Sequence, residues 1–87
     1  MTTMRAKMRL NAITNRYRST EDSPVTQETL EFSAVAAKSY PADGSDEDNT
    51  YAKFSPSGVL SLTVANPALI GKFDVGQRYY LDFTPAE

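Results

Sequence analysis

The chain has 87 residues, a formal net charge of −2, 40% hydrophobic residues and 23% charged residues, a composition typical of one folded domain rather than of a disordered chain. It contains no cysteine and no histidine, which excludes disulfide bridges and histidine-based acid–base catalysis and leaves zinc without its usual ligands. We therefore expect one domain over residues 1–87 that is not an enzyme and has no catalytic, cofactor-binding or metal site. No segment reaches the roughly 18 apolar residues of a membrane span, and the basic N-terminus has no hydrophobic run, so we expect neither a membrane segment nor a signal peptide.

A first strand is predicted over residues 4–17, because apolar side chains alternate there with basic and polar ones, which places Ala12 on the core face. Arg5, Lys7 and Arg9 fall on one face of this strand, and we call them the basic stripe. Same-face residues on a strand lie roughly 6.5–7 Å apart, a spacing comparable to that of phosphates along a nucleic-acid strand. The stripe is therefore a candidate contact for nucleic acid. The simpler interpretation is a solvated strand face on which basic residues protect a sheet edge.

A second strand is predicted over residues 26–38, after a polar loop that ends at Pro24. Leu30 and Phe32 are expected to face the core. Glu28 and Glu31 lie on the same strand, and we expect them to form ion pairs with the basic stripe across the sheet. Such pairs would give the stripe a structural role, which weakens the nucleic-acid interpretation.

A long loop is predicted over residues 39–49, and we call it the acidic loop. It contains Asp43, Asp46, Glu47 and Asp48, with no basic residue among them. An EF-hand calcium loop needs glycine at its sixth position and glutamate at its twelfth, but counting from Asp43 these positions hold Asp48 and Phe54. We therefore expect a mobile, solvated loop that a basic partner would order.

Three further strands complete the predicted fold. Pro56 and Gly58 favour a tight turn between the first two of them. Asn66-Pro67 is a favourable start for a short helical turn, which Gly71 can end. The three strands cover residues 50–55, 59–65 and 77–84. Five antiparallel strands in so short a chain predict an all-β fold, either a small five-stranded barrel or a curled sheet, with an SH3-like helical turn before the last strand.

The second half of the chain contains four short motifs. They are the Ser-Pro-Ser-Gly turn at 55–58, the Leu-x-Leu strand at 60–62, Asn66-Pro67, and Gly-x-x-Tyr-Tyr-x-Asp-Phe at 76–83. With them, the segment from Lys53 to Glu87 resembles the C-terminal half of small proteins encoded in tailed-phage genomes, and the run Met-Arg-Ala-Lys-Met-Arg-Leu-Asn-Ala-Ile-Thr at 4–14 is similar to their start. The resemblance implies a phage accessory protein attached to the particle.

The first functional hypothesis is a virion component, such as a capsid decoration or cement protein. Such a protein needs no chemistry and acts by contacts with the phage capsid protein or with copies of itself. Tyr40, Tyr51 and Tyr80 are its candidate anchors, because tyrosine gives a large contact area with few rotatable bonds. The acidic loop is its candidate charged contact, since the basic stripe of a neighbouring copy has the opposite charge.

Two alternatives are kept. One is a protein that binds single-stranded nucleic acid, with the basic stripe on phosphates and Tyr51, Phe54 or Tyr80 stacked on bases. The net charge of −2 and the acidic loop count against it. The other is an intracellular inhibitor of a host factor, in which the acidic loop mimics nucleic acid. All three place the chain in a phage particle or in the host cytoplasm.

Overall fold

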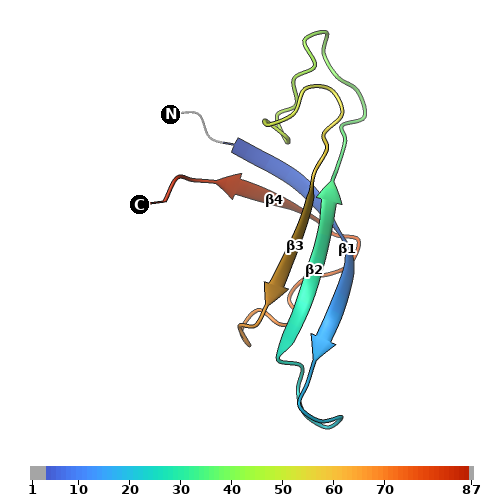
Figure 1. Cartoon of the computed structure of the whole chain (residues 1–87). Helices are drawn as coiled ribbons and strands as arrows, with labels where there is room; N and C mark the ends of the chain where they lie inside the picture. Colours follow the sequence, from blue (N-terminus) through green and yellow to red (C-terminus); the bar gives the residue numbers. More distant parts are fainter. Residues whose placement is uncertain (1–3, 87) are drawn as a thin grey trace.

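The computed structural model describes residues 4–86, and their regular secondary structure is entirely β. Four strands form one antiparallel sheet: β1 (Met4–Tyr17), β2 (Gln27–Ala34), β3 (Val59–Val64) and β4 (Arg78–Phe83). Their order is β3-β2-β1-β4, so β3 and β4 are the two edges and the sheet does not close (Figure 1). The predicted all-β class is confirmed.

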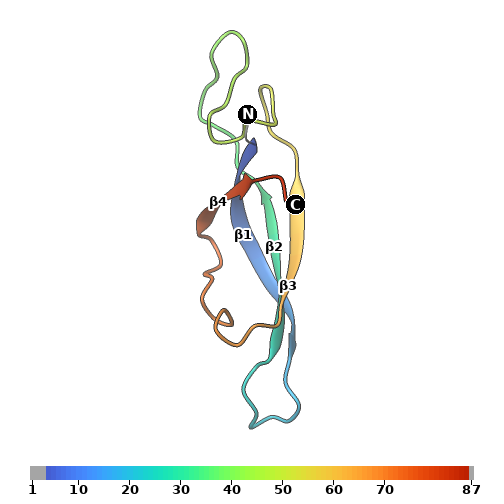
Figure 2. The ribbon, with the colours of Figure 1, turned by 90° about the vertical axis from the view of Figure 1, so that its left-hand side faces the viewer.

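The sheet is built around β1. The first half of β1 pairs with β4, from Met4 to Arg9, and the second half pairs with β2, from Met8 onward. β1 bends between the two halves, so that β4 lies at an angle to β2 and β3 (Figure 1 and Figure 2). This bend gives the open sheet a curled shape and lets β1 pair with both β2 and β4.

A register shift in β1 changes which side chains face the core. The pairing with β2 slips between Leu10 and Ala12, as in a β-bulge, which inserts one extra residue and bends the strand. Ile13 therefore lies opposite Leu30 and packs against the core. Ala12 was predicted to face the core, but it lies opposite Glu31 on the other face.

The core lies on one side of the sheet, which we call the apolar face. The segment 65–77 between β3 and β4 runs beside the sheet (Figure 2), and its Ile70 and Phe73 pack against the core. The Tyr79 ring packs edge-on against Phe32, with 6.0 Å between ring centroids, and lies 5.3 Å from the Phe73 ring. The buried apolar side chains are Ala6, Met8, Leu10, Leu30, Phe32 and Val64.

Only a small second layer of structure packs on the apolar face of the sheet in the described residues. Its radius of gyration is 15.9 Å and its principal extents are 55 × 33 × 15 Å, whereas a compact domain of this length has a radius of gyration of about 12 Å. Among the described residues, the apolar side chains from outside the sheet that pack on the core are Tyr51, Ile70 and Phe73. A sheet normally buries its apolar face against a full second layer, so part of this face stays uncovered.

The fifth strand, the barrel and the helical turn are not found in the described residues. Residues 50–55 form no strand, because Tyr51 turns into the core. Residues 66–71 form hydrogen-bonded turns in which the N–H groups of Leu69 and Ile70 both donate to the Asn66 carbonyl. A segment this short is not enough to propagate a helix.

Candidate functional site

The acidic loop is tied to the sheet by Asn49, whose side chain is fully buried. Its Oδ1 accepts a hydrogen bond from the Lys7 N–H (2.8 Å), and its Nδ2 donates to the Val35 carbonyl (2.9 Å) and to Asp46 (3.2 Å). Lys7 lies on β1, and Val35 follows the last residue of β2. The Asn49 amide therefore bridges the two strands where they separate, which explains why β2 ends earlier than predicted.

Two further contacts hold the loop. Thr50 exchanges hydrogen bonds with Arg5 on β1, through its N–H (3.0 Å) and its Oγ1 (2.8 Å). The Phe54 N–H donates to the Gly44 carbonyl (2.7 Å), and a Cβ on Gly44 would come within 2.7 Å of the Phe54 ring. Gly44 also has φ +75°, a conformation that glycine adopts at little cost. The loop that we predicted to be mobile thus has fixed points at its middle and at its C-terminal end.

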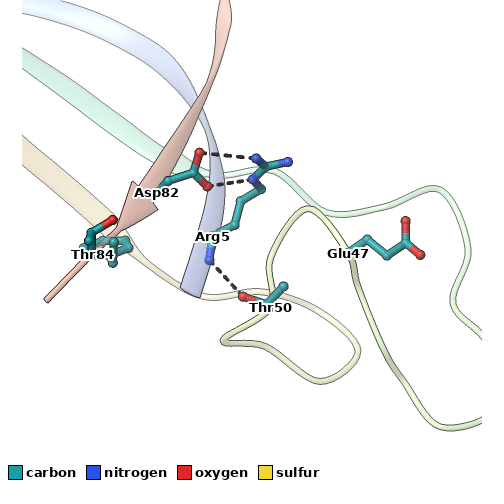
Figure 3. A pocket seen from close by; sticks show the side chains of 6 residues that line it. Arg5, Glu47, Thr50, Asp82 and Thr84 are labelled. Carbon is teal, nitrogen blue, oxygen red and sulfur yellow. Dashed lines mark hydrogen bonds and ion pairs between the residues drawn. The ribbon is translucent and has the colours of Figure 1, made fainter. Parts of the chain in front are cut away.

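Docking of the loop assembles a polar cluster on the side of the sheet opposite the core. The Arg5 guanidinium donates to both Asp82 oxygens, at 2.7 and 3.3 Å (Figure 3), and lies 4.6 Å from the centroid of the Tyr80 ring. Asp48 accepts hydrogen bonds from the Tyr80 hydroxyl (2.9 Å) and from Lys7 Nζ (3.3 Å). We define the polar cluster as Arg5, Lys7, Asp48, Tyr80 and Asp82. It joins β1, β4 and the acidic loop.

These hydrogen bonds fix the charge states of the cluster. The Tyr80 hydroxyl, followed by Lys7, lowers the pKa of Asp48, and Arg5 lowers the pKa of Asp82. Asp48 in turn raises the pKa of Tyr80, and Asp82 raises the pKa of Arg5. All four pKa values move away from neutrality, whereas a general acid or base works best with a pKa near the working pH. The cluster is therefore arranged for ion pairing rather than for proton transfer.

A shallow pocket of about 330 Å³ adjoins the polar cluster (Figure 3). Its two oppositely charged side chains on the sheet, Arg5 and Asp82, bind each other. In the described residues, no three side chains of metal-binding type lie close enough together to hold a metal ion. The lining residues are Arg5, Glu47, Thr50, Asp82, Phe83 and Thr84.

The other predicted contact residues lie in the loop and against the core. Burial raises the pKa of Tyr51, and its enclosed hydroxyl has no hydrogen-bond partner among the described residues. Tyr40 packs edge-on against Phe54, with 6.2 Å between centroids, and its hydroxyl accepts a backbone N–H from three residues earlier (3.1 Å). Asp43 accepts the Ser45 N–H (3.0 Å), which lowers the pKa of Asp43. Of the three tyrosines, Tyr80 is the most exposed, and their role in an interface stays a prediction.

The predicted partners of the basic stripe were wrong. Glu28 shares the face of Leu30, so it is buried on the apolar face, where it accepts the Gly71 N–H (3.2 Å) and lies 3.6 Å from the Arg16 guanidinium. The carboxylates that pair with the stripe come instead from β4 and the acidic loop. Arg9 lies opposite Arg78 in the β1–β4 register, and in the described part of the chain neither forms an ion pair.

Sequence reasoning missed an apolar surface. Leu62, on the edge strand β3, is 50% exposed on the apolar face, whereas Val59, which is 85% exposed, lies opposite Ser33 on the other face of the sheet. Met4 (40%) and Phe83 (48%), which lie opposite each other at the end of the β1–β4 pair, are also exposed. The run Val-Leu-Ser-Leu-Thr-Val at 59–64, which has no charged residue, was the available signal, but only the strand order places it at an edge.

A comparison with protein-family models found no match, and comparisons with curated proteins and with solved structures found no significant match. The described residues contain no helix that is long and apolar enough to cross a membrane.

Proposed function

We propose that this chain is a non-enzymatic structural protein that binds other protein subunits, as a capsid decoration or cement protein of a tailed phage does. The observation that carries the proposal is the uncovered apolar face of a sheet with little second layer. An exposed apolar patch on a folded protein is typical of an interaction site. Leu62 and Phe83 are each about half exposed on this face, and the strand registers place them in line with Ile13 and Met4, near the two ends of β1. A bound subunit that buries both would therefore extend along the sheet.

The use of charge in the molecule supports protein contacts over nucleic-acid contacts. Two of the three residues in the basic stripe, Arg5 and Lys7, are bound to carboxylates of the same chain. A phosphate backbone would have to displace Asp82 and Asp48 to reach them. Electrostatic binding of nucleic acid therefore begins with a competition inside the protein, whereas binding through the apolar face requires no such exchange.

The phage setting comes from the resemblance of the C-terminal motifs, and the structure gives these motifs concrete roles. Gly76 has φ +95°, which suits glycine at the turn before β4. Asn66 Oδ1 accepts the Ala68 N–H (3.0 Å) in the turn after β3. The first tyrosine of the Tyr-Tyr pair, Tyr79, packs on the core, whereas the second, Tyr80, lies in the polar cluster.

The proposal is tested with phage particles produced from a genome that lacks the gene for this chain. Purified chain is mixed with these particles, and the amount that sediments with them is measured at low salt and at about 1 M salt, where the Debye length is about 3 Å. Apolar docking predicts retention at both salt concentrations. The control for nucleic acid is the anisotropy of a fluorescent single-stranded oligonucleotide. No sedimentation at either salt concentration, combined with salt-sensitive oligonucleotide binding, would overturn the proposal in favour of the nucleic-acid alternative.

A further inference from the structure

The two edges of the sheet are protected to different degrees. β4 carries Arg78 and Asp82, and charged side chains on an edge strand hinder pairing with another chain. β3, from Val59 to Val64, contains no charged residue, no proline and no glycine. A neutral, apolar edge strand of this kind is a template for addition of a further strand.

The ladder between β2 and β3 fixes which backbone groups of β3 are free. The Ala34 N–H donates to the Gly58 carbonyl (3.0 Å), directly before β3 begins. Because backbone groups alternate in direction along an antiparallel strand, Leu60 and Leu62 point theirs toward β2. Val59, Ser61 and Thr63 must then point their N–H and C=O groups outward from the edge. In the described part of the chain, no hydrogen bond from outside the sheet reaches these outward groups.

The side-chain pattern of β3 is the same in both directions. Leu60-Ser61-Leu62-Thr63-Val64 alternates apolar and hydroxyl side chains symmetrically about Leu62. We infer that β3 pairs antiparallel with β3 of a second copy of this chain, around a two-fold axis at Leu62. In this register each outward-facing Ser61 lies opposite Thr63 of the second copy, and Leu60 lies opposite Val64.

This register satisfies both the backbone and the side chains. The outward N–H and C=O groups of Ser61 and Thr63 meet their counterparts as hydrogen-bonded pairs, while Leu62 meets its own copy as a non-hydrogen-bonded pair, with about 4.5 Å between Cα atoms. The two apolar faces become continuous across the axis, so the half-exposed Leu62 side chains bury each other. No charge lies on either strand to oppose the pairing.

Self-pairing deepens the proposed function by naming one partner, but the two can fail separately. A chain that is a monomer in solution can still bind a phage particle, and a dimer can form without any particle. Because the two-fold contact uses the same edge on both copies, the assembly closes at two chains. We therefore expect a discrete dimer rather than a fibre.

Single cysteines test the register directly, because the natural chain contains none. The expected Cα separation at Leu62 falls within the range of about 4.4–6.8 Å that a disulfide spans. Leu62→Cys should therefore become a covalent dimer under mild oxidation. Val75→Cys is the matched control, because Val75 is also exposed (55%) but lies in the turn before β4, and it should stay monomeric. Faster cross-linking of Ser61→Cys than of Leu62→Cys would overturn the register.

Substitutions of Leu62 by charged residues test the same contact without covalent chemistry. Light scattering after size exclusion should give the wild-type chain about twice its mass of 9.6 kDa. Leu62→Lys and Leu62→Glu should each lose the dimer, because two like charges then meet on the axis. An equal mixture of the two should recover it, which also shows that both variants fold. A monomeric wild type, dimers that persist in either variant, or a mixture that stays monomeric would each overturn the inference.

Discussion

The substitution Asn49→Ala tests the contact that builds the polar cluster. It leaves the Lys7 N–H and the Val35 carbonyl without the partners that they have at 2.8 and 2.9 Å. Each partly buried polar group that loses its partner costs about 1–3 kcal/mol, so we expect the two groups together to lower the free energy of unfolding by about 2–6 kcal/mol. A domain of 87 residues has only about 4–13 kcal/mol in total. This one side chain therefore accounts for a large share of the stability.

Urea unfolding monitored by circular dichroism measures this loss. With a slope near 1 kcal/mol/M, the unfolding midpoint should fall by about 2 M or more. Asn66→Ala is the matched control, because Asn66 is exposed and makes one local hydrogen bond to the Ala68 N–H. If Asn49→Ala lowers the midpoint no further than Asn66→Ala does, the bridging role of Asn49 is refuted.

The nearly isosteric change Asn49→Asp separates hydrogen bonding from volume. It keeps the acceptor for the Lys7 N–H but replaces the amide donor with an oxygen that faces the Val35 carbonyl and Asp46. Burial and Asp46 should raise the folded-state pKa of the new carboxyl, so the protonated form is favoured by folding. The deficit relative to wild type should therefore be large at pH 7 and shrink as the pH falls toward 4. A deficit that does not depend on pH would contradict this account.

Three further predictions concern the core, the loop and the polar cluster. Leu30→Ala should lower the free energy of unfolding by about 2–5 kcal/mol in the same urea assay, because Leu30 is fully buried; a loss below about 1 kcal/mol would be inconsistent with this core. Gly44→Ala should destabilise the loop, because its Cβ would meet the Phe54 ring and its φ is positive; amide exchange at residue 54 should accelerate, and unchanged exchange would disprove the contact. Asp48 and Asp82 have lowered pKa values, so their stabilising effect is present above the unfolded pKa near 4 and is lost as the pH falls through their folded pKa. The urea midpoint of Asp82→Asn should therefore fall less below pH 4 than that of the wild type. An equal fall would exclude the ion pair of Asp82 as its cause.

Local patterns in the sequence were sufficient to locate the four strands of the sheet, because a period of two depends only on neighbouring residues. The alternation along β1 therefore placed Arg5, Lys7 and Arg9 together on one face. The β-bulge after Leu10 was not predictable, since an extra residue is defined only by the register of the partner strand. For the same reason Ala12 was assigned to the wrong face.

The prediction of a fifth strand over residues 50–55 was wrong for a different reason. Tyr51 and Phe54 have high strand propensity, but propensity in strands mainly reflects packing on neighbours. Here Tyr51 packs into the core and Phe54 takes a positive φ of 61°, which lies outside the extended region that strand residues normally occupy. Tertiary contacts thus overrode a local preference.

The polar cluster was only partly accessible from sequence. The charge difference between the N-terminal strand and the acidic loop was visible, and Lys7 does pair with Asp48. The pair of Arg5 with Asp82 spans 77 positions along the chain. It depends on the β1–β4 register, which no single-strand pattern specifies.

The most direct test of the proposed function is quantitative mass spectrometry of purified phage particles produced from the genome that encodes this chain. The number of copies of the chain is counted relative to the major capsid protein, before and after a high-salt wash. A decoration or cement protein predicts a fixed ratio that corresponds to many copies per particle and survives the wash. Absence of the chain from washed particles would contradict the account and direct the search to partners in the host cytoplasm.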